Sequence, residues 1–130
     1  MAKCLVTGGA GFIGSHIVDG LIEKGHQVRV FDNLSTGKKD NLLHLESKID
    51  FVLGDLRNRE ALEKACQGID YVFHVAALRA VLRSVDDPSE TNDVNVTGTL
   101  NLLLAAREKA VKRVVYSSSS AIYGETEKFP

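Results

Sequence analysis

The chain of 130 residues has the length of a single domain and is large enough to bury a substantial core. Hydrophobic residues make up 44% and charged residues 25% of the sequence, a balance typical of folded globular proteins rather than disordered chains. Lys and Arg number 16 against 17 Asp and Glu, which leaves a net charge of -1. Because this balance provides no basic field for phosphate backbones or anionic lipids, we expect neither nucleic acid nor a membrane as a partner.

The sequence also bears on location and on metal binding. No run of about 18 apolar residues occurs, and the first apolar run, in "MAKCLVTGG", is too short for a signal segment, so we expect a cytoplasmic protein. Cys4 and Cys66 lie far apart and lack the spacing of metal ligands. We therefore predict two reduced thiols and no metal site.

The first half of the chain alternates strand and helix patterns. Residues 2–7 form a short β-rich run that ends in glycines, and residues 12–25 show helical spacing of apolar residues before a glycine. A second strand is predicted at residues 26–32. Residues 33–48 are the least regular stretch, with a short helix expected at residues 39–45.

The second half continues this alternation. A third strand is predicted at residues 49–55, a short helix at residues 58–68 and a fourth strand at residues 69–77. A long helix is expected over residues 86–110, followed by a fifth strand over residues 111–119.

The strands are continuously apolar and are separated by helices, which indicates a parallel sheet covered on both faces and joined by right-handed crossovers. The sequence therefore predicts an α/β fold, a Rossmann-type doubly wound parallel sheet with strand order 3-2-1-4-5. On this interpretation the chain stops after strand five.

The long helix carries its own start signal and an unusual apolar surface. Asp87 is expected at the N-cap, with Pro88 at the first helical position and Glu90 three residues past the cap, where their groups satisfy free amides. The run "LNLLLAA" is apolar around most of the helix, which predicts two buried faces, one against the sheet and one against another helix or a second subunit. The alternative is that a few leucines are simply exposed.

A glycine turn joins the first strand to the first helix. In "VTGGAGFIG", Gly8, Gly11 and Gly14 follow the strand at steps of three. Glycines there permit a tight turn, expose bare backbone to a pyrophosphate and let the helix pack close to the strand. The amides of Phe12 and Ile13 would point at the anion. A merely structural turn is the alternative.

Carboxylates at the ends of the next two strands favour a dinucleotide. Asp32 ends the second strand about twenty residues on, where it can accept hydrogen bonds from ribose hydroxyls and repel the 2′-phosphate of NADP. Lys38 and Lys39 keep NADP open as an alternative. Asp55 faces the same crevice near the adenine or caps the following helix, and the two roles are compatible.

Six motifs in chain order resemble one known family. They are "TGGAGFIG", "VFDNLSTG", "GDLRN", "HVAALRAV", "DDPSETNDVNVTGTLNLL" and "SSSSAIYG", and they span the sequence from Lys3 to Pro130. The chain resembles the extended short-chain dehydrogenases/reductases, and among them the NAD-dependent nucleotide-sugar epimerases of the UDP-glucose 4-epimerase type. The resemblance implies an NAD-binding domain over residues 1–130 and epimerisation of a nucleotide sugar through a keto intermediate.

The resemblance also implies roles for individual residues. The segment from His74 to Ala77 would line the nicotinamide end, Arg79 would lie near the cofactor phosphates, and Asn95 would make a structural hydrogen bond behind the site. The implied cofactor-binding residues are Gly8, Gly11, Phe12, Ile13, Gly14, Asp32, Asn33, Thr36, Gly37, Asp55, Leu56, Val75, Ala76, Ala77, Arg79, Asn95 and Ser117.

The serine run supplies the implied catalytic hydroxyl. Ser119, four residues before Tyr123, matches the family's catalytic Ser or Thr, and Ser120 is the second candidate. The structural alternative is that these serines only satisfy backbone groups. Related dehydratases carry an acidic pair at this place, and "SSSSAIYG" has none, which favours epimerisation over dehydration.

The family's Tyr-x-x-x-Lys pair is missing from the sequence. The residues four positions after Tyr71, Tyr116 and Tyr123 are Val75, Ser120 and Glu127. We therefore expect the chain alone to bind NAD without catalysis, as the N-terminal portion of a homodimeric epimerase. A non-catalytic NAD-binding module and another extended short-chain enzyme, such as a nucleotide-sugar dehydratase, are the alternatives.

Overall fold

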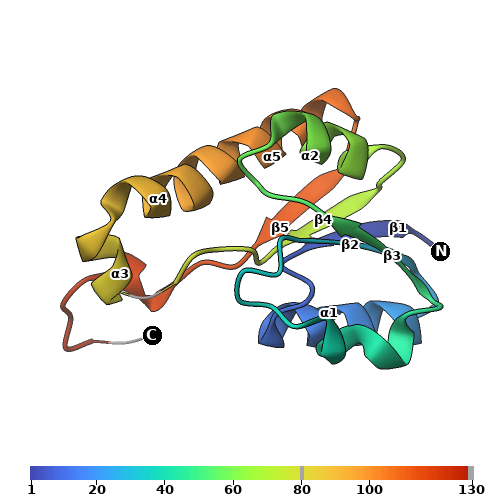
Figure 1. The fold of residues 1–130 in the computed structure, drawn as a ribbon, viewed down its shortest axis with the longest axis horizontal. Helices are drawn as coiled ribbons and strands as arrows, with labels where there is room; N and C mark the ends of the chain where they lie inside the picture. Colours follow the sequence, from blue (N-terminus) through green and yellow to red (C-terminus); the bar gives the residue numbers. More distant parts are fainter. Residues whose placement is uncertain (80, 129–130) are drawn as a thin grey trace.

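A computed structural model of the chain describes residues 1–79 and 81–128. Ala80, in the "HVAALRAV" motif, and residues 129–130 of the predicted domain lie outside the described residues. Five parallel strands form one sheet in the order β3-β2-β1-β4-β5, which confirms the predicted fold. In Figure 1, α1 lies on one face of the sheet, and α2 and α5 lie on the other.

The strands and helices of the first half agree with the sequence patterns. They are β1 (Lys3–Thr7), α1 (Phe12–Glu23), β2 (Gln27–Asp32), the 3-10 helix η1 (Lys39–Leu45) and β3 (Ile49–Leu53). The predicted short helix at residues 39–45 is thus confirmed as η1. Val6, Val18, Val30, Leu42 and Leu45 bury one face of the sheet beneath α1 and η1.

The second half covers the opposite face. It comprises α2 (Arg59–Cys66), β4 (Tyr71–His74), α3 (Val81–Asp86), α4 (Pro88–Asn92), the π-helical turn η2 (Asp93–Thr97), α5 (Gly98–Glu108), β5 (Arg113–Tyr116) and the 3-10 helix η3 (Ser120–Tyr123). Leu5, Leu62, Val72 and Leu102 are fully buried in this core. Because β1 lies between β2 and β4, the strand order of the sheet reverses at the carboxyl end of β1.

The long helix begins as predicted. Asp87 is the N-cap of α4, and its Oδ1 accepts a hydrogen bond from the Glu90 amide at 3.0 Å, with Pro88 at the first helical position. The Glu90 carboxylate does not complete a capping box, because it pairs with Arg83 of α3 at 2.8 Å. The short helix α3, which the sequence patterns did not predict, thus docks onto the start of α4.

Only one side of the long helix is buried within this chain. Leu102, Ala105 and Ala106 pack into the core, whereas Leu100 is 54% and Leu103 46% exposed. The second buried face therefore stays a prediction that depends on a partner. Gly98, at the start of α5, lies against Leu56, and a Cβ at Gly98 would come within 2.7 Å of the Leu56 Cβ.

In the part of the chain that the structure describes, no helix is long and apolar enough to cross a membrane. Cys4 and Cys66 are buried free thiols. Burial raises the pKa of Cys66 to about 11, so this thiol is kept in its protonated, unreactive form.

Candidate cofactor-binding site

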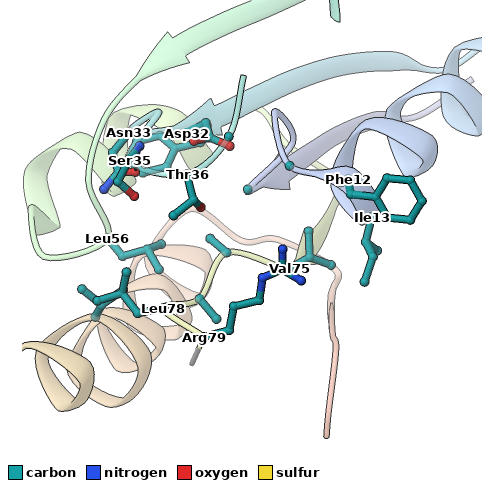
Figure 2. A pocket seen from close by; sticks show the side chains of 18 of the residues that line it. Phe12, Ile13, Asp32, Asn33, Ser35, Thr36, Leu56, Val75, Leu78 and Arg79 are labelled. Carbon is teal, nitrogen blue, oxygen red and sulfur yellow. Dashed lines mark hydrogen bonds between the residues drawn. The ribbon is translucent and has the colours of Figure 1, made fainter. Parts of the chain in front are cut away.

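A crevice of about 380 Å³ opens at the carboxyl ends of β1, β2 and β4, where the strand order reverses. This volume falls within the range of small-molecule sites. Figure 2 places Asp32, Asn33 and Thr36 on one side of it and Phe12 and Ile13 on another. The crevice brings together most of the predicted cofactor residues: Gly8, Gly11, Phe12, Ile13, Gly14, Asp32, Asn33, Thr36, Gly37, Asp55, Leu56, Val75, Ala76, Ala77 and Arg79.

The glycine turn is packed tightly against its neighbours. Gly8 has a φ of +69°, and a Cβ on it would lie 2.8 Å from the Ala76 backbone, so this glycine lets the turn touch the loop that follows β4. A Cβ at Gly14 would collide with the Gly8 carbonyl. Gly11 is the N-cap of α1 and offers no side-chain cap. The first turn of α1 therefore faces the crevice with its backbone amides and its positive dipole end.

Asp32 is buried and held by two backbone amides. Its Oδ2 accepts from the Ala10 amide at 2.9 Å, and its Oδ1 accepts from the Leu34 amide at 2.8 Å. Each oxygen keeps a lone pair for a further donor. The carboxylate is thus fixed at the crevice, ready to accept hydrogen bonds from a diol.

The loop after β2 is fastened to the glycine turn through Ala10. The Ala10 carbonyl accepts hydrogen bonds from the Lys38 amide at 3.0 Å and from Asn41 Nδ2 at 2.9 Å. Lys38 lines the crevice, whereas the Lys39 ammonium lies 5.3 Å from the centroid of the Phe51 ring. Sequence reasoning missed Asn41, whose only signal was its place in the predicted short helix.

Asp55 is engaged by two partners at the crevice wall. Its Oδ1 accepts from the Arg57 amide and Nε, both at 2.9 Å, and its Oδ2 accepts from Arg57 Nη2 at 2.8 Å and from Asn33 Nδ2 at 3.1 Å. The Arg57 guanidinium holds the pKa of Asp55 well below its usual range. The alternative role of Asp55 as a helix cap was wrong, because Asn58 caps α2 by accepting from the Ala61 amide.

His74 does not line the crevice, which corrects one expectation. Val75, Ala76 and Ala77 do, but the His74 ring is buried in the opposite direction because side chains alternate along β4. Its Nδ1 lies 2.6 Å from the Thr7 hydroxyl, and its Nε2 lies 2.9 Å from the Thr99 hydroxyl. Burial lowers the pKa of His74 from 6.5 to about 4, so the ring is neutral near pH 7.

Asn95 also lies behind the crevice rather than in it. Its Nδ2 donates to the Leu78 carbonyl at 2.7 Å, and its Oδ1 accepts from the Leu78 amide at 2.8 Å. This pair of hydrogen bonds fixes the loop after β4 to η2. Leu78 itself lines the crevice.

The three predicted serines stand outside the crevice lining. Ser117 continues the strand pairing, since its amide donates to the His74 carbonyl at 3.1 Å. Ser119 caps η3 by accepting from the Ala121 amide at 3.1 Å, and both Ser119 and Ser120 are exposed. The catalytic role of these hydroxyls stays a prediction.

Several lining residues were not predicted. Only the folded loops bring them to the crevice. They are Phe31, Ser35, Lys38, Asn41, Gly54, Leu78 and Val94. Across residues 1–79 and 81–128, no group of three or more His, Cys, Asp or Glu side chains is placed to hold a metal ion.

Curated proteins similar to this chain include UDP-glucose 4-epimerases. That of Klebsiella pneumoniae is 42% identical over 134 residues, covering 98% of this chain and 96% of the relative. That of Neisseria meningitidis serogroup C is 43% identical and covers 100% of this chain and 40% of the relative. For most of the first matches, the chain spans between 37% and 41% of the relative's length.

Solved structures of related enzymes superpose closely. The UDP-glucose 4-epimerase of Stenotrophomonas maltophila, solved with NAD and formylated UDP-arabinopyranose, gives a TM-score of 0.93 at 34% identity and covers 100% of this chain and 40% of its own. The Thermus thermophilus UDP-glucose 4-epimerase in complex with NAD gives 0.89 at 45% identity, with coverage of 97% and 40%.

A dehydratase is similar as well. The dTDP-glucose 4,6-dehydratase of Streptomyces venezuelae, solved with NAD bound, gives a TM-score of 0.91 at 37% identity, covering 98% of this chain and 42% of its own. The sequence profile of one family, described as the NAD dependent epimerase/dehydratase family, matches residues 4–130. With its glycine turn, its fixed Asp32 and a match over nearly all of its length, the chain belongs to this NAD-dependent family.

Proposed function

We propose that residues 1–130 form the NAD-binding domain of a nucleotide-sugar 4-epimerase that interconverts UDP-glucose and UDP-galactose. The observation that carries the proposal is the crevice in which the bare glycine turn, the fixed Asp32 carboxylate and the small side chains after β4 meet. The chain spans about two fifths of the length of most of its relatives, so the activity is proposed for the whole protein and not for this chain alone.

The residues present fit NAD. A pyrophosphate fits against the first turn of α1, where no side chain occupies the N-cap. The Asp32 carboxylate suits a ribose diol and repels a 2′-phosphate. Ala76 and Ala77 leave room for a planar ring next to the backbone. When bound, NAD supplies a reversible hydride acceptor for a sugar carbinol.

The proposed binding roles follow the layout of the crevice. Asp55, Asn33 and Leu56 would hold the adenine end, and Thr36 and Gly37 would adjoin its ribose. Phe12 and Ile13 would flank the phosphates, which Arg79 would approach from the loop after β4, toward the interior of the crevice as drawn in Figure 2. Asn95 would support this loop from behind through its two hydrogen bonds to Leu78.

Epimerisation is favoured over dehydration by the segment after β5. The hydroxyls of Ser117 to Ser120 occur there, and no Asp or Glu stands among them to act as the acid and base of a water elimination. Ser119 is the proposed catalytic hydroxyl, with Ser120 as the second candidate. A nucleotide-sugar dehydratase is the second candidate function, since a dehydratase of this family superposes on the chain.

A homodimer is the proposed assembly of the whole protein. The exposed leucines of α5, Leu100 and Leu103, together with Val96 of η2, offer an apolar surface. A second copy would bury this surface and supply the second buried face that the sequence predicts for the helix.

The proposal can be tested by calorimetric titration of the chain with NAD and with NADP. We expect NAD to bind and NADP to bind more weakly. Asp32→Asn should weaken NAD binding about tenfold, because it removes charge-assisted hydrogen bonds. Asp40→Asn is the matched control, since Asp40 is an exposed acid of η1 outside the crevice.

A coupled assay then separates binding from catalysis. The 130-residue chain supplied with NAD and UDP-glucose is expected to form no UDP-galactose, because it carries no Tyr-x-x-x-Lys pair. A chain that binds neither dinucleotide would refute the assignment of the domain. Turnover by the purified chain would refute the need for that pair.

A further inference from the structure

The loop after β4 is held from behind by a series of buried hydrogen bonds that begins at β1. The Thr7 carbonyl accepts from the Val75 amide at 3.3 Å, and the Thr7 hydroxyl oxygen accepts from the Ala76 amide at 3.4 Å. The same hydroxyl lies 2.6 Å from His74 Nδ1. Thr7 is fully buried, and neither Thr7 nor His74 lines the crevice.

The series continues into the long helix. His74 Nε2 lies 2.9 Å from the Thr99 hydroxyl, and that hydroxyl donates to the Asn95 carbonyl at 2.7 Å. The side chain of Asn95 in turn bonds both backbone groups of Leu78. One continuous network therefore joins β1, β4 and η2 to the two ends of the cofactor loop.

The network has a definite direction. The single hydroxyl hydrogen of Thr99 goes to the Asn95 carbonyl, so toward His74 the Thr99 oxygen can only accept, and the proton of the neutral ring must be on Nε2. Nδ1 is then bare and accepts from the Thr7 hydroxyl. The Thr7 oxygen remains free to accept from the Ala76 amide, as observed.

We propose that His74 is a positioning residue of the crevice, which links Thr7 to Thr99 as a neutral ring protonated on Nε2 and thereby sets the place of residues 75–79. The position of this loop matters because Ala76 touches the phosphate turn: a Cβ on Gly8 would lie only 2.8 Å from the Ala76 backbone. A small displacement of Ala76 therefore alters the crevice on both sides.

This inference rests on the proposed function, since it assigns the network to the binding of NAD. It differs from a plain core role for His74, which would stabilise the fold without affecting the loop. The two roles make different predictions for a variant that breaks the network without emptying the core. Thr7→Val is such a variant, because valine has nearly the shape of threonine and lacks its hydroxyl.

The experiment compares Thr7→Val with Thr7→Ser, which keeps the hydroxyl, and with Val18→Ala, which destabilises the other core beneath α1. In the unliganded wild type, long-range 1H–15N spectra should show His74 with a bare Nδ1 and a protonated Nε2. In Thr7→Val we expect the proton to stay on Nε2, because the Thr99 oxygen can only accept, while the Ala76 amide exchanges faster with solvent and NAD binds about three- to tenfold more weakly. Thr7→Ser should keep both the Ala76 exchange rate and the NAD affinity at their wild-type values.

Val18→Ala should lower stability and leave the tautomer, the Ala76 exchange and the relative NAD affinity unchanged. The proposal is overturned if His74 carries its proton on Nδ1, or if Thr7→Val loses stability as Val18→Ala does while NAD affinity is kept. If the wild type binds no NAD, the proposed cofactor function fails, and with it the role of His74 in binding, whereas the spectra and the exchange rates still decide whether the network holds the loop.

Discussion

His74 should make the stability of this domain depend on pH between about pH 4 and 6.5. The residue is only 6% exposed, and its two ring nitrogens contact neutral hydroxyls rather than carboxylates. Burial lowers its pKa from 6.5 to about 4. The folded state therefore disfavours the charged ring, and the unfolded state accepts the proton first.

The sign and size follow from proton linkage. Between pH 4 and 6.5 the unfolded chain binds a proton at His74 that the folded chain does not, so the free energy of unfolding rises with pH across this window. Integrating that difference from about pH 4.5 to about pH 7.5, at about 1.4 kcal/mol for each pKa unit, gives about 2.5 kcal/mol. Asp55 and Asp70 have lowered pKa values in the folded state, so their contribution to stability is lost only at lower pH, as the pH falls below their ordinary pKa of 3.8.

Urea denaturation at a series of pH values, followed by circular dichroism, measures this difference. His74→Gln is the matched variant, because the amide cannot titrate and can still donate to Thr99. We expect the wild type to lose about 2.5 kcal/mol of unfolding free energy over this range and the variant to lose far less. Equal pH slopes in the two proteins would refute the buried, neutral state of His74.

Two further substitutions test the packing behind the crevice and the start of α2. Gly98→Ala should destabilise the domain by about 1–2 kcal/mol in thermal or urea unfolding, because the clash with the Leu56 Cβ outweighs the gain in helix propensity. Since Leu56 lines the crevice, NAD binding should weaken too. A variant more stable than the wild type would contradict the close contact. Asn58→Ala should cost about 1 kcal/mol through the lost N-cap while NAD affinity stays unchanged, and an unchanged unfolding midpoint would count against the cap.

Local patterns in the sequence determined the fold and the glycine turn. Continuous apolar strands between helices require a parallel sheet with both faces covered, and right-handed crossovers then leave few possible strand orders. The spacing of Gly8, Gly11 and Gly14 and the place of Asp32 at a strand end were sufficient to predict one side of the crevice. These features depend on neighbours within a few residues, which a single sequence displays.

The tertiary structure decided the features that join distant residues. The hydrogen bond between Thr7 and His74 spans 67 positions, and that between Ala10 and Asn41 spans 31. No local period marks such pairs, so His74 was expected in the crevice and Asn41 was missed. For Asp55 a helix cap was the alternative to a place in the crevice, and only the folded chain placed it against Arg57 and Asn33. The sequence thus determined which backbone lines the crevice, and the packing of distant side chains decided how that backbone is held.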